Sequence, residues 1–319
     1  MAATTLPPPG GPAPGPSVDL SGDPRRHRRE RTMGAIFFLS AFLSLVISAL
    51  ILISLFSNGT EFFTDVDWGN VFGASSWNPR QDQFGITTIL AGSLIVTGIA
   101  MLVAAPLGLG AAVYLSEYAR PNIRTALKPI IEVLAGIPSV VLGVFALNWI
   151  APEVVGRIFG REHSAGSMMA AGIGVGILTI PLVASVSEDA MRAVPDSLRQ
   201  ASAGIGARKM STTLRVVLPA AVSGIVAAMI LAISRAIGET MVVFIAGGAA
   251  DSATYTTNPL DGSLTMTAAM ASLAVGTENV RGSGLAVPSL YFVGVVLFFF
   301  TFLLNLIADR FVRRVRQVY

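Results

Sequence analysis

Two charged residues of opposite sign lie four positions apart inside a long apolar run. Arg235 and Glu239 interrupt the stretch Pro219–Ala246. An arginine at the centre of a lipid-exposed helix costs about 2.5–3.5 kcal/mol on insertion scales, so this side chain should face protein or water. Helical residues four apart share a face, which predicts that the two side chains pair. A guanidinium is a permanently charged, planar fork of donors that suits an oxyanion.

Two interpretations of this pair stay open. In the first, the pair is a structural salt bridge that only fixes helix packing. In the second, Arg235 binds the substrate and Glu239 holds the guanidinium when no substrate is present. Thr240 and Ser139, the latter beside a predicted helix break in another apolar run, add hydroxyl donors to the same path. A desolvated oxyanion needs many donors, so we expect a second subunit to supply more of them.

Other kinds of chemistry find no support in the sequence. The chain has no cysteine, and neither His27 nor His163 has an acidic or histidine partner at ligand spacing, so we expect no metal site. Gly204–Lys209 is glycine-rich and basic but lacks the residue order of a phosphate-binding loop. Glu188 and Asp189 lie at the end of an apolar run, where we expect a solvated helix end. The chain is therefore expected to be neither an ATPase nor a hydrolase.

The composition is that of a membrane protein. Of 319 residues, 53% are hydrophobic and 13% are charged, against about 25% charged in soluble domains. Six apolar runs are long enough to span a bilayer. We predict an all-α polytopic protein with six transmembrane helices: Met33–Phe56, Ile86–Leu115, Pro129–Ile150, Met168–Val186, Pro219–Ala246 and Pro288–Ile307.

Glycine and proline mark special places inside these runs. Gly108 in the second run, and Gly172 and Gly176 in the fourth, suit close helix packing in lipid. Gly136-Ile137-Pro138-Ser139 predicts a break within the third run. Broken helices are tolerated at membrane depth only where protein or a water-filled path satisfies the backbone.

The basic residues predict the orientation. Seventeen of the 22 Lys and Arg residues lie in the N-terminal arm, the 116–128 turn, the 187–218 loop and the C-terminal tail. This asymmetry places both termini in the cytoplasm. We expect residues 1–32 to form a disordered tail, rich in Pro and Gly and then in Arg, and residues 33–319 to form one transmembrane domain. The segment Ser57–Gln83 is expected to be an exposed loop.

The loop 187–218 is the longest polar, basic connection between two apolar runs. Pro195-Asp196-Ser197 predicts a helix start, and Gly204 and Gly206 then break that helix before Ala207–Leu218 resumes it. Two short helices joined by small residues form a compact knuckle that fits another protein's groove. The alternative is a solvated connector.

At this point the residues resemble a known pattern. The permeases of ABC importers carry Glu-Ala-Ala, then Gly, Ile and Leu-Pro at fixed spacing in this loop. The spacing is kept here by Gln200, Ala201, Ser202, Gly206, Val216, Leu218 and Pro219. The chain departs from the pattern at Gln200 for Glu, Ser202 for Ala and Val216 for Ile. The loss of the Glu charge puts one contact with an ATPase subunit in doubt.

Three further segments resemble the phosphate-specific branch of these permeases, and its C-type subunit more than its A-type subunit. They are Ala135–Val141, Glu188–Pro195 and Arg235–Met241. The likeness runs from about Ile86 to the C-terminus and leaves the N-terminal tail outside.

The resemblance implies the type I ABC importer permease fold and a non-catalytic subunit in the bacterial inner membrane. It implies translocation of inorganic phosphate into the cytoplasm. It further implies a second permease subunit, two cytoplasmic subunits that use ATP and Mg and hold the loop 187–218, and an extracytoplasmic phosphate-binding protein. No cofactor is implied for this chain, and no nucleic acid.

Three rival functions stay open. One is an importer permease for another oxyanion, sulfate or molybdate, which would also bind Arg235. A second is a proton-coupled secondary transporter in which Glu239 carries the proton. A third is a membrane-embedded enzyme that uses Glu239 as a general base, but no nucleophile or metal partner accompanies it.

Overall fold

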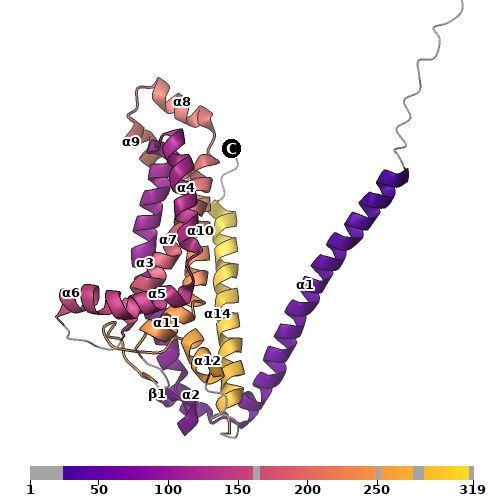
Figure 1. The fold of residues 1–319 in the computed structure, drawn as a ribbon, viewed down its shortest axis with the longest axis vertical. Helices are drawn as coiled ribbons and strands as arrows, with labels where there is room; N and C mark the ends of the chain where they lie inside the picture. The colour runs from indigo at the N-terminus through magenta and orange to yellow at the C-terminus, as the bar shows by residue number, and fades with distance from the viewer. Residues whose placement is uncertain (1–23, 161–165, 249–252, 276–283, 316–319) are drawn as a thin grey trace, which may run out of the picture. The chain divides into compact units, whose positions relative to one another are not determined.

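The structure is a computed structural model that describes residues 24–160, 166–248, 253–275 and 284–315. The chain divides into two compact units, Met1–Ser54 and Leu55–Tyr319. Helices dominate both units, which confirms the all-α prediction (Figure 1).

The first unit consists of most of helix α1 (Pro24–Asp65), which contains the whole span expected at Met33–Phe56. The helix begins nine residues earlier than expected, at a proline, which is well tolerated in the first helical turn. Residues 24–32 are thus helical, although we expected them to belong to a disordered tail. Residues 1–23 of that tail lie outside the described part of the chain.

Within the described residues, six helices are long and apolar enough to cross a membrane, as predicted. They are Arg29–Asp65, Ile86–Tyr118, Ser139–Phe159, Met168–Arg192, Lys209–Ile237 and Ala286–Arg310.

The second unit is built around two closely packed helices, α3 (Ile86–Val113) and α7 (Met168–Arg192). The predicted packing glycines lie at their contact. A Cβ atom on Gly172 would lie 2.6 Å from the Ile99 Cβ, and one on Gly108 would lie 2.7 Å from the Val183 Cβ. The absent side chains therefore set the distance between the two helices.

The third predicted span is placed differently. Helix α4 (Pro121–Ala135) starts eight residues before the expected start and ends at the predicted break. Helix α5 (Ser139–Phe145), the π-helical segment η3 (Ala146–Gly156) and α6 (Arg157–Phe159) follow without a further break. The span expected at Pro129–Ile150 is therefore wrong, because Pro121 and not Pro129 occupies the first turn of the helix. Figure 1 shows α5 to α6 running across the direction shared by α3 and α7.

The fifth predicted span is also divided. Helix α9 (Lys209–Thr212) continues through the π-helical segment η4 (Thr213–Val217) into α10 (Leu218–Ile237). The backbone then leaves the helix at Gly238 and resumes as the short helix α11 (Met241–Ala246). A single helix over Pro219–Ala246 is therefore wrong, and Gly238, a weak helix former, marks the interruption.

One end of the second unit carries a small folded cap. The segment expected to be an exposed loop contains α2 (Trp68–Gly73), the short 3-10 helix η1 (Pro79–Gln81) and the strands β1 (Ser76–Asn78) and β2 (Gln83–Phe84). Strand β1 pairs antiparallel with β2 on one side and with β3 (Ala253–Thr254) on the other. Its Trp77 is fully buried, so the prediction of an exposed loop is wrong. Large aromatic side chains close together can bury one another even in a polar segment.

The remaining helices complete the unit. Helix α12 (Met266–Val275) lies near the cap and packs against α14 (Ala286–Val315) and α11. The C-terminal end of α14 points away from the cap. It lies toward the part of the unit that carries α8 (Asp196–Gly204) and α9 (Figure 1).

Candidate functional site

Arg235 and Glu239 lie on the two sides of the elbow between α10 and α11. The Gly238 N–H donates to the Ser234 carbonyl at 3.3 Å, and the Glu239 N–H donates to the Ala236 carbonyl at 3.3 Å. Arg235 is thus in the last turn of α10, whereas Glu239 lies beyond its end. The helical geometry that would put the two side chains on one face stops between them.

The expected Arg235–Glu239 ion pair is absent among the described residues. The Glu239 Oε1 instead accepts a hydrogen bond from the Val242 N–H at 3.4 Å and caps the start of α11. The Arg235 side chain is exposed, and within the described part of the chain it makes neither an ion pair nor a hydrogen bond. The rule for residues four apart failed here because it requires a continuous helix.

The elbow is held in place by hydroxyl groups from α12 and its approach. The Thr267 Oγ1 donates to the Glu239 carbonyl at 2.7 Å and lies 3.0 Å from the Thr265 Oγ1. The Thr240 Oγ1 donates to the Gly238 carbonyl at 3.3 Å. Carbonyls freed by the helix break therefore find partners inside the protein, as a break at membrane depth requires.

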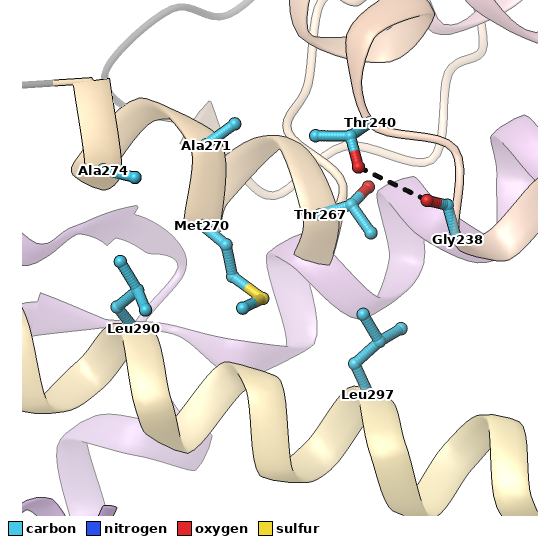
Figure 2. Close-up of a pocket in the computed structure, with 8 residues that line it drawn as sticks. All are labelled: Gly238, Thr240, Thr267, Met270, Ala271, Ala274, Leu290 and Leu297. Carbon is cyan, nitrogen blue, oxygen red and sulfur yellow. Dashed lines mark hydrogen bonds between the residues drawn. The ribbon is translucent and has the colours of Figure 1, made fainter. Parts of the chain in front are cut away.

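A cavity of about 400 Å³ adjoins the elbow (Figure 2). Its walls come from the elbow, α12 and α14 and comprise Gly238, Thr240, Thr267, Met270, Ala271, Ala274, Leu290 and Leu297. Most of these side chains are apolar, and both threonine hydroxyls already donate to backbone carbonyls. The cavity by itself thus offers few donors to an anion, and Arg235 is not among its lining residues.

Ser139, the fourth residue predicted for a substrate path, starts helix α5 directly after the break. Helix α5 packs against α11: a Cβ on Gly143 would lie 3.1 Å from the Met241 carbonyl oxygen. The break before α5 was predicted and the break before α11 was not. The two breaks introduce helices that contact each other. No contact joins the Ser139 side chain to Arg235 or Glu239 in the described residues.

The loop 187–218 contains the first predicted short helix, α8, whereas the second, α9, is the beginning of a longer helix that continues through η4 into α10. Helix α8 begins after Pro195, and Gly206 has a φ of +78°, a conformation that favours glycine. The Ser202 Oγ lies 2.8 Å from the Thr212 Oγ1, which ties α8 to α9. Between the helices, Ile205 is 86% exposed.

The residues of the Glu-Ala-Ala pattern are distributed over three helical segments. Gln200, Ala201 and Ser202 lie on α8, and only Ser202 of these is buried. Val216 lies on η4 and is half-buried, whereas Leu218 and Pro219 are the first two residues of α10. Ser202 in place of Ala therefore supplies the hydroxyl that ties the two short helices together.

A charged cluster that we did not predict lies beside this loop. Glu188 is fully buried, so the expected solvated helix end is wrong at this residue. Its carboxylate lies 3.4 Å from the Lys128 Nζ and 3.9 Å from the nearest nitrogens of Arg124 and Arg192. The hydrogen bond from Lys128 to Asp189 raises the pKa of Lys128, although partial burial lowers it; the charges of Glu188 and Asp189 raise it further. The sequence contained one signal of this cluster, the spacing of four residues between Glu188 and Arg192.

Among the described residues, no three or more His, Asp or Glu side chains gather in a way that could hold a metal ion. We expected no metal site at His27 or His163. Residue His163 and the side chain of His27 lie outside the described part of the chain.

Comparison with known proteins places the chain in a family. The family model described as "Binding-protein-dependent transport system inner membrane component" matches residues 104–317, which is more than half of the chain. The chain belongs to this family. It is thus a multi-pass inner-membrane permease subunit of the ABC transporter class, and the matched region contains both helix breaks and the loop 187–218.

Relatives of this permease carry more specific names. It is 31% identical over 311 residues to "Phosphate transport system permease protein PstC" of Mesorhizobium japonicum, which covers 90% of this chain and 92% of that protein. It is 33% identical over 225 residues to "Phosphate transport system permease protein PstA 1" of Mycobacterium tuberculosis, covering 70% of this chain and 71% of that protein. The greater coverage supports the C-type resemblance.

Among solved structures, the permease is similar to a chain of a bacterial alginate ABC transporter crystallised with a periplasmic protein that holds an alginate pentasaccharide. The TM-score is 0.65 at 14% identity, with 92% of this chain and 98% of that chain covered. This similarity shows the ABC importer permease fold, as the family resemblance implied.

Proposed function

We propose that this permease is a subunit of an ATP-driven importer that moves inorganic phosphate into the cytoplasm. The observation that carries the proposal is the 31% identity, over 90% of the chain, to a phosphate transport permease of the C type. Arg235 on the apolar helix α10, which has no partner among the described residues, supports it, because a phosphate dianion is best held by fixed positive charge in a desolvated site.

Arg235 is the central residue of the proposed substrate path. Thr240 and Ser139 lie at the starts of α11 and α5, the two helices introduced by breaks. Glu239 keeps the elbow in shape by capping α11. Since the adjoining cavity is mostly apolar, further donors have to come from a second permease subunit, related to this one and facing it across the path.

Two cytoplasmic subunits hydrolyse ATP, with Mg, outside this chain. They hold the loop 187–218, where the exposed Ile205, between α8 and α9, and the exposed Met210, on α9, offer an apolar anchor. Both termini then lie in the cytoplasm. The folded cap at the opposite end of the unit meets the extracytoplasmic phosphate-binding protein.

Replacing Ile205 by Asp tests the docking surface. We expect the affinity for the ATPase subunits to fall roughly 30-fold, because central apolar anchors contribute about 2 kcal/mol or more to such interfaces. Pull-down of the ATPase subunits at several concentrations measures the change. Ile205→Leu keeps the apolar volume and should bind as wild type does; equal binding by all three forms would contradict the docking surface.

The transport assay decides the proposed function. The complete complex in proteoliposomes should take up labelled phosphate only with ATP inside and loaded binding protein outside. Excess sulfate or molybdate should not compete. Competition by either anion would instead assign the permease to that oxyanion, and uptake driven by a proton gradient without ATP would assign it to the secondary transporters.

A further inference from the structure

Two arginines join the helix ends around the loop 187–218. The Arg199 guanidinium on α8 donates to the carbonyl oxygens of Val194 at 2.6 Å and Met191 at 2.8 Å, at the end of α7. It also lies 3.0 Å from the Glu117 carboxylate on the π-helical segment η2 (Tyr114–Tyr118), which continues α3. Carbonyls at a helix C-terminus lack partners within the helix and favour cations. Arg199 therefore binds α8 firmly to the end of α7.

The second arginine starts from α4. The Arg124 Nε donates to the Leu115 carbonyl at 3.0 Å, and its Nη2 donates to the Ser116 carbonyl at 3.3 Å. The same guanidinium faces the buried Glu188 of α7. Arg124 thus joins α4 to the end of α3 and to α7.

Glu188 is the point at which these contacts meet. The two oxygens of its carboxylate form ion pairs with cationic side chains of α4 and α7. No donor among the described residues forms a hydrogen bond with either oxygen. A fully buried carboxylate without hydrogen bonds depends on its ion pairs, because removing a charge from water costs several kcal/mol. Ion pairs without directional bonds also tolerate small shifts of the helices that carry them.

We infer that Glu188 is a positioning residue that makes α4 follow the movement of α8 and the end of α7. Movement of α8 reaches α7 through Arg199. It then reaches α4 because Arg124 and Lys128 have to stay close to the buried charge of Glu188. Helix α4 ends at the break before Ser139, and α5 beyond it packs against α11. The inference rests on the proposed function, since it assigns Glu188 a role between ATP hydrolysis and phosphate movement.

The ratio of phosphate taken up to ATP hydrolysed tests the inference in proteoliposomes with the complete complex. Glu188→Gln should lower this ratio about fivefold or more, the lower end of typical coupling between sites, while ATP hydrolysis continues. Glu188→Asp keeps the charge and should restore part of the ratio. The matched control is Glu153→Gln, which removes the acid of an exposed pair of the same spacing, Glu153–Arg157, and should leave the ratio unchanged.

Each other outcome has a defined meaning. An unchanged ratio in Glu188→Gln overturns the inference, and so does an equal loss of uptake and hydrolysis, which a merely structural residue would give. Where Glu188→Gln does not assemble, Arg199→Lys takes its place: one ammonium cannot reach both carbonyls and Glu117, so the ratio should fall similarly, and a retained ratio overturns the inference. Absence of phosphate uptake by the wild type would instead refute the proposed function.

Discussion

Replacing Arg235 by Gln should lower ATP-driven phosphate uptake at least 30-fold. Truncating one partner of a desolvated, hydrogen-bonded charge pair costs about 2–5 kcal/mol, and each 1.4 kcal/mol is a tenfold change. Arg235 has no competing partner among the described residues, so its guanidinium is available to an anion without first breaking an internal ion pair. Uptake of labelled phosphate and release of ADP should be followed in the same proteoliposomes.

Two variants make this result specific. Arg235→Lys keeps the charge but loses the planar fork, so it should retain part of the uptake. Arg310→Gln removes another exposed arginine on an apolar helix, α14, and should transport as the wild type does. If Arg235→Gln assembles, hydrolyses ATP and still takes up phosphate normally, Arg235 is outside the substrate path. The phosphate assignment would then rest on family similarity alone.

Replacing Gly172 by Val should prevent the second unit from packing properly. The new Cβ would lie 2.6 Å from the Ile99 Cβ and 3.1 Å from the Val96 carbonyl oxygen, so α3 and α7 would have to separate. Overpacking typically costs about 1–3 kcal/mol, and here a branched side chain meets backbone as well as side chain. We expect a lower midpoint of thermal unfolding in detergent and a lower yield of assembled complex.

Gly98→Val is the matched control for this prediction. Gly98 lies in the middle of α3, and nothing lies within 4 Å of the Cβ it would carry. The helix propensity changes in the same way at both positions, so the difference between the two variants isolates the packing. Equal stability of Gly172→Val and Gly98→Val would show that the glycines do not set the distance between α3 and α7.

Much of the fold could be predicted from local signals in the sequence. Pro195 and the glycines at 204 and 206 correctly predicted where α8 begins and where the knuckle turns, because these residues restrict or free the backbone by themselves. Pro138 likewise predicted the break between α4 and α5. The six apolar runs were counted correctly because bilayer thickness fixes the length of a spanning helix.

Features that depend on distant parts of the chain could not be predicted. Glu188 looks like a surface residue until α4 brings Arg124 and Lys128 against it. Trp77 lies in a polar segment, and its burial depends on strands that pair across much of the sequence. The Arg235–Glu239 pair failed for a more local reason: Gly238 ends the helix between them. The geometry of the candidate site therefore follows from the helix breaks. The periodic spacing of residues along a continuous helix does not predict it.

The pairing of β1 also constrains the order in which the protein can be completed during synthesis. Strand β1 is the middle strand of the sheet, yet its partner β3 is made only after five of the six candidate spans have left the ribosome. Until then one edge of β1 carries unpaired backbone groups, which can pair with other strands. The cap must therefore close late, and the nascent chain has to protect that edge throughout the insertion of its first five spans.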